Sequence, residues 1–105
     1  MKAGRELDAL VAEKVFKMTV WFDEEGEPIG QGIALRVEIP HFSTKIESAW
    51  IVVEKMNCHY IIASAEDSKE SWVHFGNEEN AVIEETPLAI CLSALLTLED
   101  KTCSL

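Results

Sequence analysis

The segment that most constrains the fold is PHFSTKIESAWIVVEKM, residues 40–56, because it joins a helix start to an amphipathic helix. Pro40 ends the preceding strand, and Ser43 or Thr44 then offers a side-chain oxygen to the free amides of the first helical turn. Thr44 and Glu47 have the spacing of a capping box, so we predict that the helix begins at Ser43 or Thr44. The predicted inward stripe consists of Ile46, Ala49, Trp50, Val53 and Met56.

The rest of the chain alternates helix and strand patterns without a linker to a second domain. Helical spacing of apolar residues predicts helices over residues 4–18 and 87–98, and the second one has Thr86 as its cap and Pro87 at its first position. Strict alternation predicts a half-buried strand over residues 33–39. The other predicted strands are residues 19–22, 59–65, 71–75 and 81–83, of which 59–65 and 71–75 form a hairpin.

These elements predict a single α+β domain that spans residues 1–105. The hairpin makes the small sheet, of three to four strands, mainly antiparallel, and about three helices are available to cover both of its faces. The last helix is apolar on nearly every side, so a sheet, another helix or a second subunit must cover it broadly. Cys91 lies in this apolar run and is predicted to be a core residue.

Charge and cysteine content restrict the partners and the compartment. Lysine and arginine total 9 against 19 aspartate and glutamate residues, and the formal charge of −10 argues against direct nucleic-acid binding. The N-terminus lacks the apolar core of a secretory signal, and the longest apolar run is shorter than the roughly 20 residues that span a membrane. The 3 cysteines form no CxxC pair, which fits a reducing compartment. We expect a soluble cytoplasmic protein without membrane contact.

Metal binding or catalysis is suggested by Cys58 together with the three histidines, His41, His59 and His74. Zinc ligands normally have a short fixed separation, and here Cys58 and His59 are adjacent, which places them on opposite faces of a strand. A Cys58 thiol with His74 as its base would make the chain a small hydrolase, but no oxyanion loop is recognisable. We therefore expect no metal, no cofactor and no catalytic residue.

The first candidate ligand site lies at the start of the central helix. The free amides behind Ser43 and Thr44 can hold an anion, although side-chain capping alone also explains these two residues. Arg36 and His41 lie nearby in the sequence and add cationic groups. A small anionic ligand is the chemistry that this group of residues would recognise.

The second candidate site is a strand face. Trp72 and His74 share one face of the predicted strand over residues 71–75, and Val73 and Phe75 share the other. If helices cover both faces, Trp72 is a core residue; otherwise this face is a surface for a ligand or a partner.

Acidic residues form two groups that are typical of solvated loops. An alternative interpretation is that they imitate the charge of nucleic acid. The groups consist of Asp23, Glu24, Glu25 and Glu27, and of Glu78, Glu79, Glu84 and Glu85.

Several blocks of the sequence resemble one known family. PHFSTKIESAWIVVEKM, WVHFG and ETPLAICLSALLTL, together with AGRELDALVAEKV near the N-terminus, resemble the phage ABA sandwich domain of Bacillus-type phages and prophages. The resemblance implies a three-layer α-β-α sandwich and a phage or prophage origin, hence the cytoplasm of a bacterial host. It transfers no catalytic residue and no activity. Residues 23–38 depart from the pattern through a longer connection with its own strand, which leaves the strand count open.

Together these observations favour a non-enzymatic phage or prophage accessory protein. It would bind a host or phage protein or a small anionic ligand, and self-association into a homo-oligomer is left open. The alternatives are sequestration of a host signalling nucleotide, an acidic DNA mimic that inhibits a host protein, and a small hydrolase.

Overall fold

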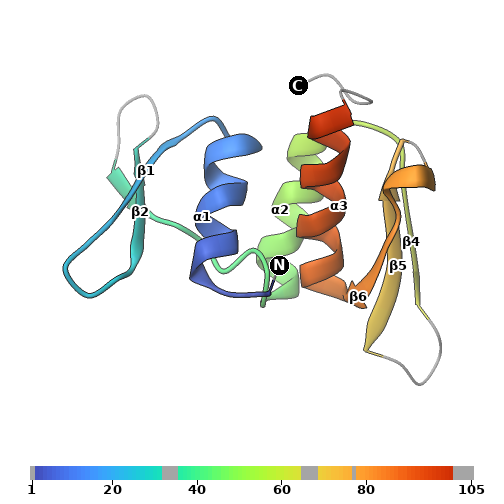
Figure 1. Cartoon of the computed structure of the whole chain (residues 1–105), viewed down its shortest axis with the longest axis horizontal. Coiled ribbons are helices and arrows are strands. Elements are labelled where there is room, and N and C mark those ends of the chain that lie inside the picture. Colours follow the sequence, from blue (N-terminus) through green and yellow to red (C-terminus); the bar gives the residue numbers. More distant parts are fainter. Residues whose placement is uncertain (1, 32–35, 65–68, 77, 101–105) are drawn as a thin grey trace.

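The computed structural model describes residues 2–31, 36–64, 69–76 and 78–100. Its strands form two antiparallel sheets, β1-β2-β3 and β4-β5-β6, and in Figure 1 the helices of the described chain lie between these sheets. The elements in order are α1 (Arg5–Lys14), β1 (Thr19–Phe22), β2 (Pro28–Gln31), β3 (Arg36–Glu38), α2 (Ile46–Met56), β4 (Tyr60–Ser64), β5 (Glu70–Phe75), the 3-10 helix η1 (Glu78–Asn80), β6 (Val82–Glu85) and α3 (Thr86–Asp100).

The predicted α+β class, the antiparallel pairing and the three helices are confirmed in the described ranges. The structure adds a second sheet, because β2 pairs with both β1 and β3 and so joins these three strands into a unit of their own. Each sheet turns one face towards the helices, which therefore occupy the space between the sheets (Figure 1). Of the strand predicted over residues 33–39, residues 33–35 lie outside the described part of the chain.

The first sheet depends on a tight turn and on one glycine. The carboxylate of Asp23 accepts the backbone N–H groups of Glu25 and Glu27 at 2.9 Å each, which closes the β1-β2 turn. In β2, a Cβ atom on Gly30 would lie 2.5 Å from Ile39 Cδ1 and 2.7 Å from Met18 Cε. The absence of a side chain at Gly30 therefore lets this sheet approach its neighbours closely.

Helix α3 lies at the centre of the hydrophobic core. It packs on β5 and β6 and also contacts both α1 and α2, which explains how so apolar a helix is covered within one chain. It begins at Thr86, one residue before the predicted first position at Pro87, and Cys91 is fully buried, as predicted. The α3 residues buried in the core are Ala89, Ile90, Cys91 and Ala94.

The buried stripe of α2 differs from the predicted one. Ile46 and Trp50 were expected inside, but their side chains are 41% and 42% exposed, so the prediction that Trp50 faces the core is wrong. Apolar residues follow one another without interruption along residues 49–53, and spacing alone does not choose between two overlapping stripes. Packing against α3 makes that choice. The buried residues of α2 are Ala49, Val52, Val53 and Met56.

The start of α2 is also corrected. The helix begins at Ile46, and Lys45 occupies the N-cap position without a side-chain capping bond. The capping box predicted for Thr44 and Glu47 is therefore wrong. Ser43 does not act as a cap because its hydroxyl is bound to a residue of α1, as described below.

Candidate functional site

The predicted anion site at the start of α2 is filled by the protein's own side chains. The buried Ser43 donates to Asp8 Oδ1 twice, from its hydroxyl at 2.6 Å and from its backbone N–H at 2.8 Å. Arg5 donates from Nη1 to Asp8 Oδ2 at 2.8 Å and from Nη2 to the carbonyl oxygen of Ile39 at 2.7 Å. The amide that an anion would need thus already binds a buried carboxylate, which would also repel a second anion.

The other residues of that predicted site lie elsewhere or face the solvent. Arg36, on β3, places its guanidinium carbon 5.4 Å from the centroid of the Trp21 ring, a cation–π contact. His41 and Thr44 are exposed, and the N–H of Thr44 donates to the carbonyl oxygen of His41 at 3.3 Å. Arg36 therefore belongs to the β1-β2-β3 sheet, whereas Ser43 belongs to a polar network that joins α1 to the segment before α2.

The strand face that carries Trp72 and His74 is present as predicted from the alternation. Their ring centroids are 4.9 Å apart, and the register places Ile61 opposite His74 and Ile83 opposite Trp72. His74 is 2% exposed, and neither of its ring nitrogens has a hydrogen-bond partner among the described residues. In Figure 1 the helices lie on the opposite side of this sheet, so the face that bears Ile83, 65% exposed, points outwards.

The predicted pair of Cys58 and His74 is not brought together by the strand register. His74 is paired with Ile61, three positions along the chain from Cys58, which precedes β4. Burial raises the pKa of the Cys91 thiol far above its ordinary range, and the nearby Asp8 carboxylate raises it further. Cys91 therefore remains a protonated core thiol. The described residues contain no group of three histidine, cysteine, aspartate or glutamate side chains that could hold a metal ion.

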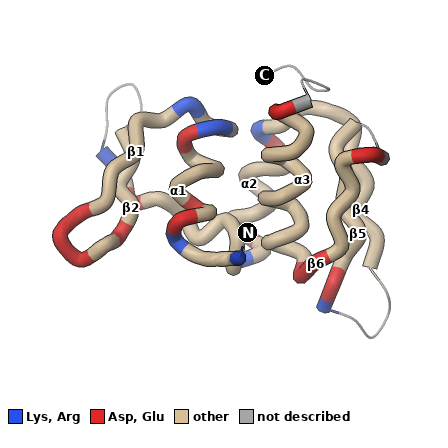
Figure 2. The backbone as a smooth tube through the Cα atoms, in the orientation of Figure 1, with Lys and Arg blue, Asp and Glu red and all other residues tan. Residues whose placement is uncertain are grey.

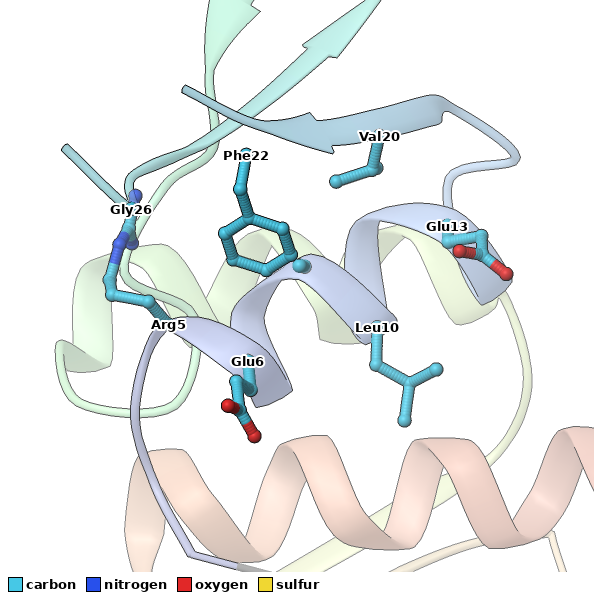
Figure 3. A pocket seen from close by; sticks show the side chains of 8 residues that line it. Arg5, Glu6, Leu10, Glu13, Val20, Phe22 and Gly26 are labelled. Carbon is cyan, nitrogen blue, oxygen red and sulfur yellow. The ribbon is translucent and has the colours of Figure 1, made fainter. Parts of the chain in front are cut away.

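A groove of about 730 Å³ lies between α1 and β1 and is shown in Figure 3. Phe22 and Val20 extend from β1 towards α1, and Phe22 is 49% exposed. The carboxylates of Glu6 and Glu13 are exposed along the same part of α1. The lining residues are Arg5, Glu6, Ala9, Leu10, Glu13, Val20, Phe22 and Gly26.

The charge of this groove is negative in spite of Arg5. The Arg5 guanidinium donates from Nε to Glu27 Oε2 at 3.0 Å and also binds Asp8, so two carboxylates neutralise it. Glu6 and Glu13 add two further negative charges beside the apolar floor. The groove thus combines an apolar surface with an acidic rim.

Sequence reasoning missed this groove for a geometric reason. Its floor joins the alternate residues Val20 and Phe22 of β1 to Ala9 and Leu10 of α1, which precede them by about ten positions. The four-residue β1 is apolar on both of its faces, so its pattern does not say which face meets a helix. In the sequence, the acidic turn next to Phe22 was the one feature that could have indicated the groove.

A second hollow, of about 620 Å³, lies where α1 meets the last turns of α3. Leu92, Leu95 and Leu96 contribute much of its wall, and Lys14 and Lys17 are the cationic residues that line it. It is more apolar than a phosphate site would be, because leucine side chains offer phosphate oxygens no hydrogen-bond donor.

Comparisons with known proteins agree on a family. Residues 9–95 match the model of the phage ABA sandwich domain. The structure is similar to the crystal structure of a phage protein from Bacillus cereus ATCC 14579, with a TM-score of 0.75 and 31% sequence identity over 94% of this chain and 89% of that one. No curated protein matches the chain.

The described helices include none that is long and apolar enough to cross a membrane. The family match extends over most of the chain, and the similar crystal structure is itself that of a phage protein. Both findings agree with the sequence blocks around residues 40–56 and 86–98. The chain belongs to the phage ABA sandwich domain family.

Proposed function

We propose that this protein is a non-enzymatic binding module that acts in the cytoplasm of a bacterial host. Its groove between α1 and β1 would hold a basic, amphipathic segment of a host or phage protein. The observation that carries the proposal is the apolar floor around the half-exposed Phe22 next to the carboxylates of Glu6 and Glu13.

The apolar floor supplies affinity. Fully burying a phenylalanine side chain contributes about 1.5–3 kcal/mol, so covering the exposed half of Phe22 would contribute about 1 kcal/mol. Val20 and Leu10 extend the same surface, and a helix that places apolar residues on one stripe would cover all three. The ligand therefore needs an apolar stripe.

The negative charge of the groove favours a ligand that carries basic residues beside its apolar stripe. The chain carries a formal charge of −10, and Glu6 and Glu13 lie beside the apolar floor, so lysine or arginine at the edge of the ligand would be attracted. Figure 2 shows further acidic residues at the nearby β1-β2 turn. An acidic field of this kind raises the association rate of a basic partner.

The alternatives have less support. A host nucleotide or other small anion would meet Asp8 at the predicted start-of-helix site. A mimic of DNA needs a row of carboxylates, whereas Figure 2 places the acidic groups at the β1-β2 turn and near β6, at opposite ends of a molecule 40 Å long. A hydrolase would need a base close to Cys58, and His74 lies opposite Ile61 instead.

Titration with model peptides tests the proposal. The probe is a helical peptide of leucine and lysine, about 18 residues or five turns long, and its control replaces every lysine by glutamate. We expect the lysine peptide to shift the backbone NMR signals of Ala9, Val20 and Phe22, and the glutamate peptide to leave them unchanged. Equal binding of both peptides would contradict the charge argument.

Two variants locate the binding. Phe22→Ser should weaken the lysine peptide about fivefold, in line with the loss of about 1 kcal/mol. Ile83→Ser, at an exposed apolar position on the other sheet, is the matched control and should change nothing. Ile83 is the more exposed of the two side chains, at 65% against 49% for Phe22. If Ile83→Ser weakens binding and Phe22→Ser does not, the groove is not the binding site.

A further inference from the structure

Strand β4 is an edge strand without the usual protection of an edge. Among the described residues it pairs with β5 alone. Its sequence, YIIAS, contains no charged residue, no proline and no glycine. An edge of this kind presents unpaired N–H and C=O groups that can pair with a further strand, and natural proteins normally block it with charge, proline or a bulge.

The other edge strands differ from β4. Strand β6 ends in Glu84 and Glu85, and β3 begins with Arg36 and ends with Glu38. Strand β1 is uncharged but shorter, and Phe22 at its end belongs to the groove. Among the described edge strands of this acidic molecule, β4 is thus the longest one that contains no charged residue.

Strand β4 and helix α2 both carry half-exposed apolar side chains, and one pair of these side chains is in contact. The Trp50 and Tyr60 rings are in edge-to-face contact with centroids 6.3 Å apart, and Ile46 lies one turn before Trp50 on α2. Together with Ile51 and Ile61, these side chains are each 40–44% exposed. Tyr60 and Ile61 are neighbours in β4 and point to opposite faces of the sheet, so a second copy at this edge would cover part of the apolar surface, on the order of 400 Å², that the five side chains leave in water.

We propose that two copies of this chain associate through antiparallel pairing of β4 with β4, which joins their sheets into one of six strands. A two-fold axis at Ile62 sets the register. It places Tyr60 opposite Ser64 and Ile61 opposite Ala63 of the partner copy, while the half-buried Ile62 faces the same residue of the partner copy. No two charges of β4 meet.

A second copy fits this edge because the strand is complementary to itself and contains no charged residue. Standard interfaces bury about 800 Å² per partner, about twice the apolar surface available here. The dimer should therefore be reversible, with a Kd on the order of micromolar. Each copy carries a charge of −10, so salt should strengthen the dimer by screening their repulsion.

Sedimentation of the full chain tests this proposal. From about 1 μM to about 1 mM protein, we expect a reversible monomer–dimer equilibrium. The dimer should become tighter as NaCl rises from about 0.05 to about 0.5 M. A monomer at every concentration and salt level would overturn the proposal.

A matched pair of variants locates the interface. Ile61→Lys puts a charge on the β4 edge and should weaken the dimer at least about tenfold. Ile83→Lys makes the same change on the same outer face but on the β6 edge, and it should leave the dimer unchanged. A dimer that survives Ile61→Lys, or that both variants disrupt, would place the contact elsewhere. Circular dichroism confirms that both variants are folded.

A second variant and a second measurement keep the test independent of folding defects. The exposed Ala63→Lys should weaken the dimer as Ile61→Lys does, because Ala63 faces Ile61 of the partner copy. Hydrogen exchange should show that β4 amides become more protected as protein concentration rises, while β6 amides do not. Phe22→Ser should leave dimerisation unchanged, so failure of the groove proposal would not affect this one.

Discussion

Each of the two sheets is covered by a helix, but different interactions hold the two units together. Helix α3 packs on β5 and β6 through fully buried apolar residues such as Ile90, Val73 and Phe75. Helix α1 packs on β1 and β2, and its Asp8 is also joined by hydrogen bonds to Arg5 and Ser43. The unit of α3, β5 and β6 is closely packed. The unit of α1, β1 and β2 leaves Phe22 half exposed in an open groove.

The difference shows what each kind of interaction provides. Apolar packing stabilises in proportion to the area that it removes from water, and it leaves little room for a ligand. Hydrogen bonds to a buried carboxylate contribute less net stability, but they have defined directions and so set how α1 lies on the rest of the chain. We infer that the α1 unit retains a groove because part of its positioning comes from polar bonds.

The largest change in the free energy of unfolding is expected in the unit of α3, β5 and β6. Phe75→Ala removes a fully buried ring beneath α3 and should lower the free energy of unfolding by about 4 kcal/mol. Urea unfolding followed by tryptophan fluorescence measures this change. A loss below about 1 kcal/mol would mean that this core collapses around the cavity and is not tightly packed.

The next largest change in the free energy of unfolding is expected for the hydrogen bonds of Asp8 on α1. Asp8→Asn replaces an acceptor oxygen by an amide that cannot accept from Ser43 and Arg5 together, and it should cost about 3 kcal/mol. Ser43→Ala should cost about 1 kcal/mol. If the cost of the double variant equals the sum of the two single costs, the residues do not act as one network.

A smaller effect of opposite sign is expected on the outer face of β5. His74 is buried and its ring nitrogens have no partner among the described residues, so His74→Phe removes two unsatisfied polar atoms with little change of shape. It should raise the free energy of unfolding by about 1 kcal/mol. The exposed His41→Phe serves as the control and should change stability little. Destabilisation by His74→Phe would show that the imidazole nitrogens do find partners in solution.

The smallest effect concerns pH. The pKa of the Cys91 thiol is raised by burial in the folded chain, so above the ordinary value of 9.0 the unfolded thiol loses its proton while the folded one keeps it. Stability is therefore unaffected well below pH 9 and falls as pH rises through it, by about 0.4 kcal/mol at pH 9. Cys91→Ala should lack this part of the pH dependence. Identical pH profiles for both proteins would contradict the burial of the thiol.

Local patterns were sufficient for much of the fold. The strand over residues 19–22 was predicted from neighbouring residues, and so were the start of the last helix, to within one residue, and the shared face of Trp72 and His74. Each depends on alternation or on a capping position within a few residues. The anion site failed because Asp8, which binds Ser43, lies 35 positions away in the sequence.

The sequence by itself determined the α+β class, the antiparallel hairpin and the family, because these depend on local periodicity, turn residues and recognisable blocks. Only the tertiary structure decided that β1, β2 and β3 form a second sheet, that Trp50 faces the solvent, and that α1 and β1 enclose a groove. The physical reason is that a helix with apolar residues on several sides has no buried face until a neighbour covers one. That choice depends on contacts between distant segments.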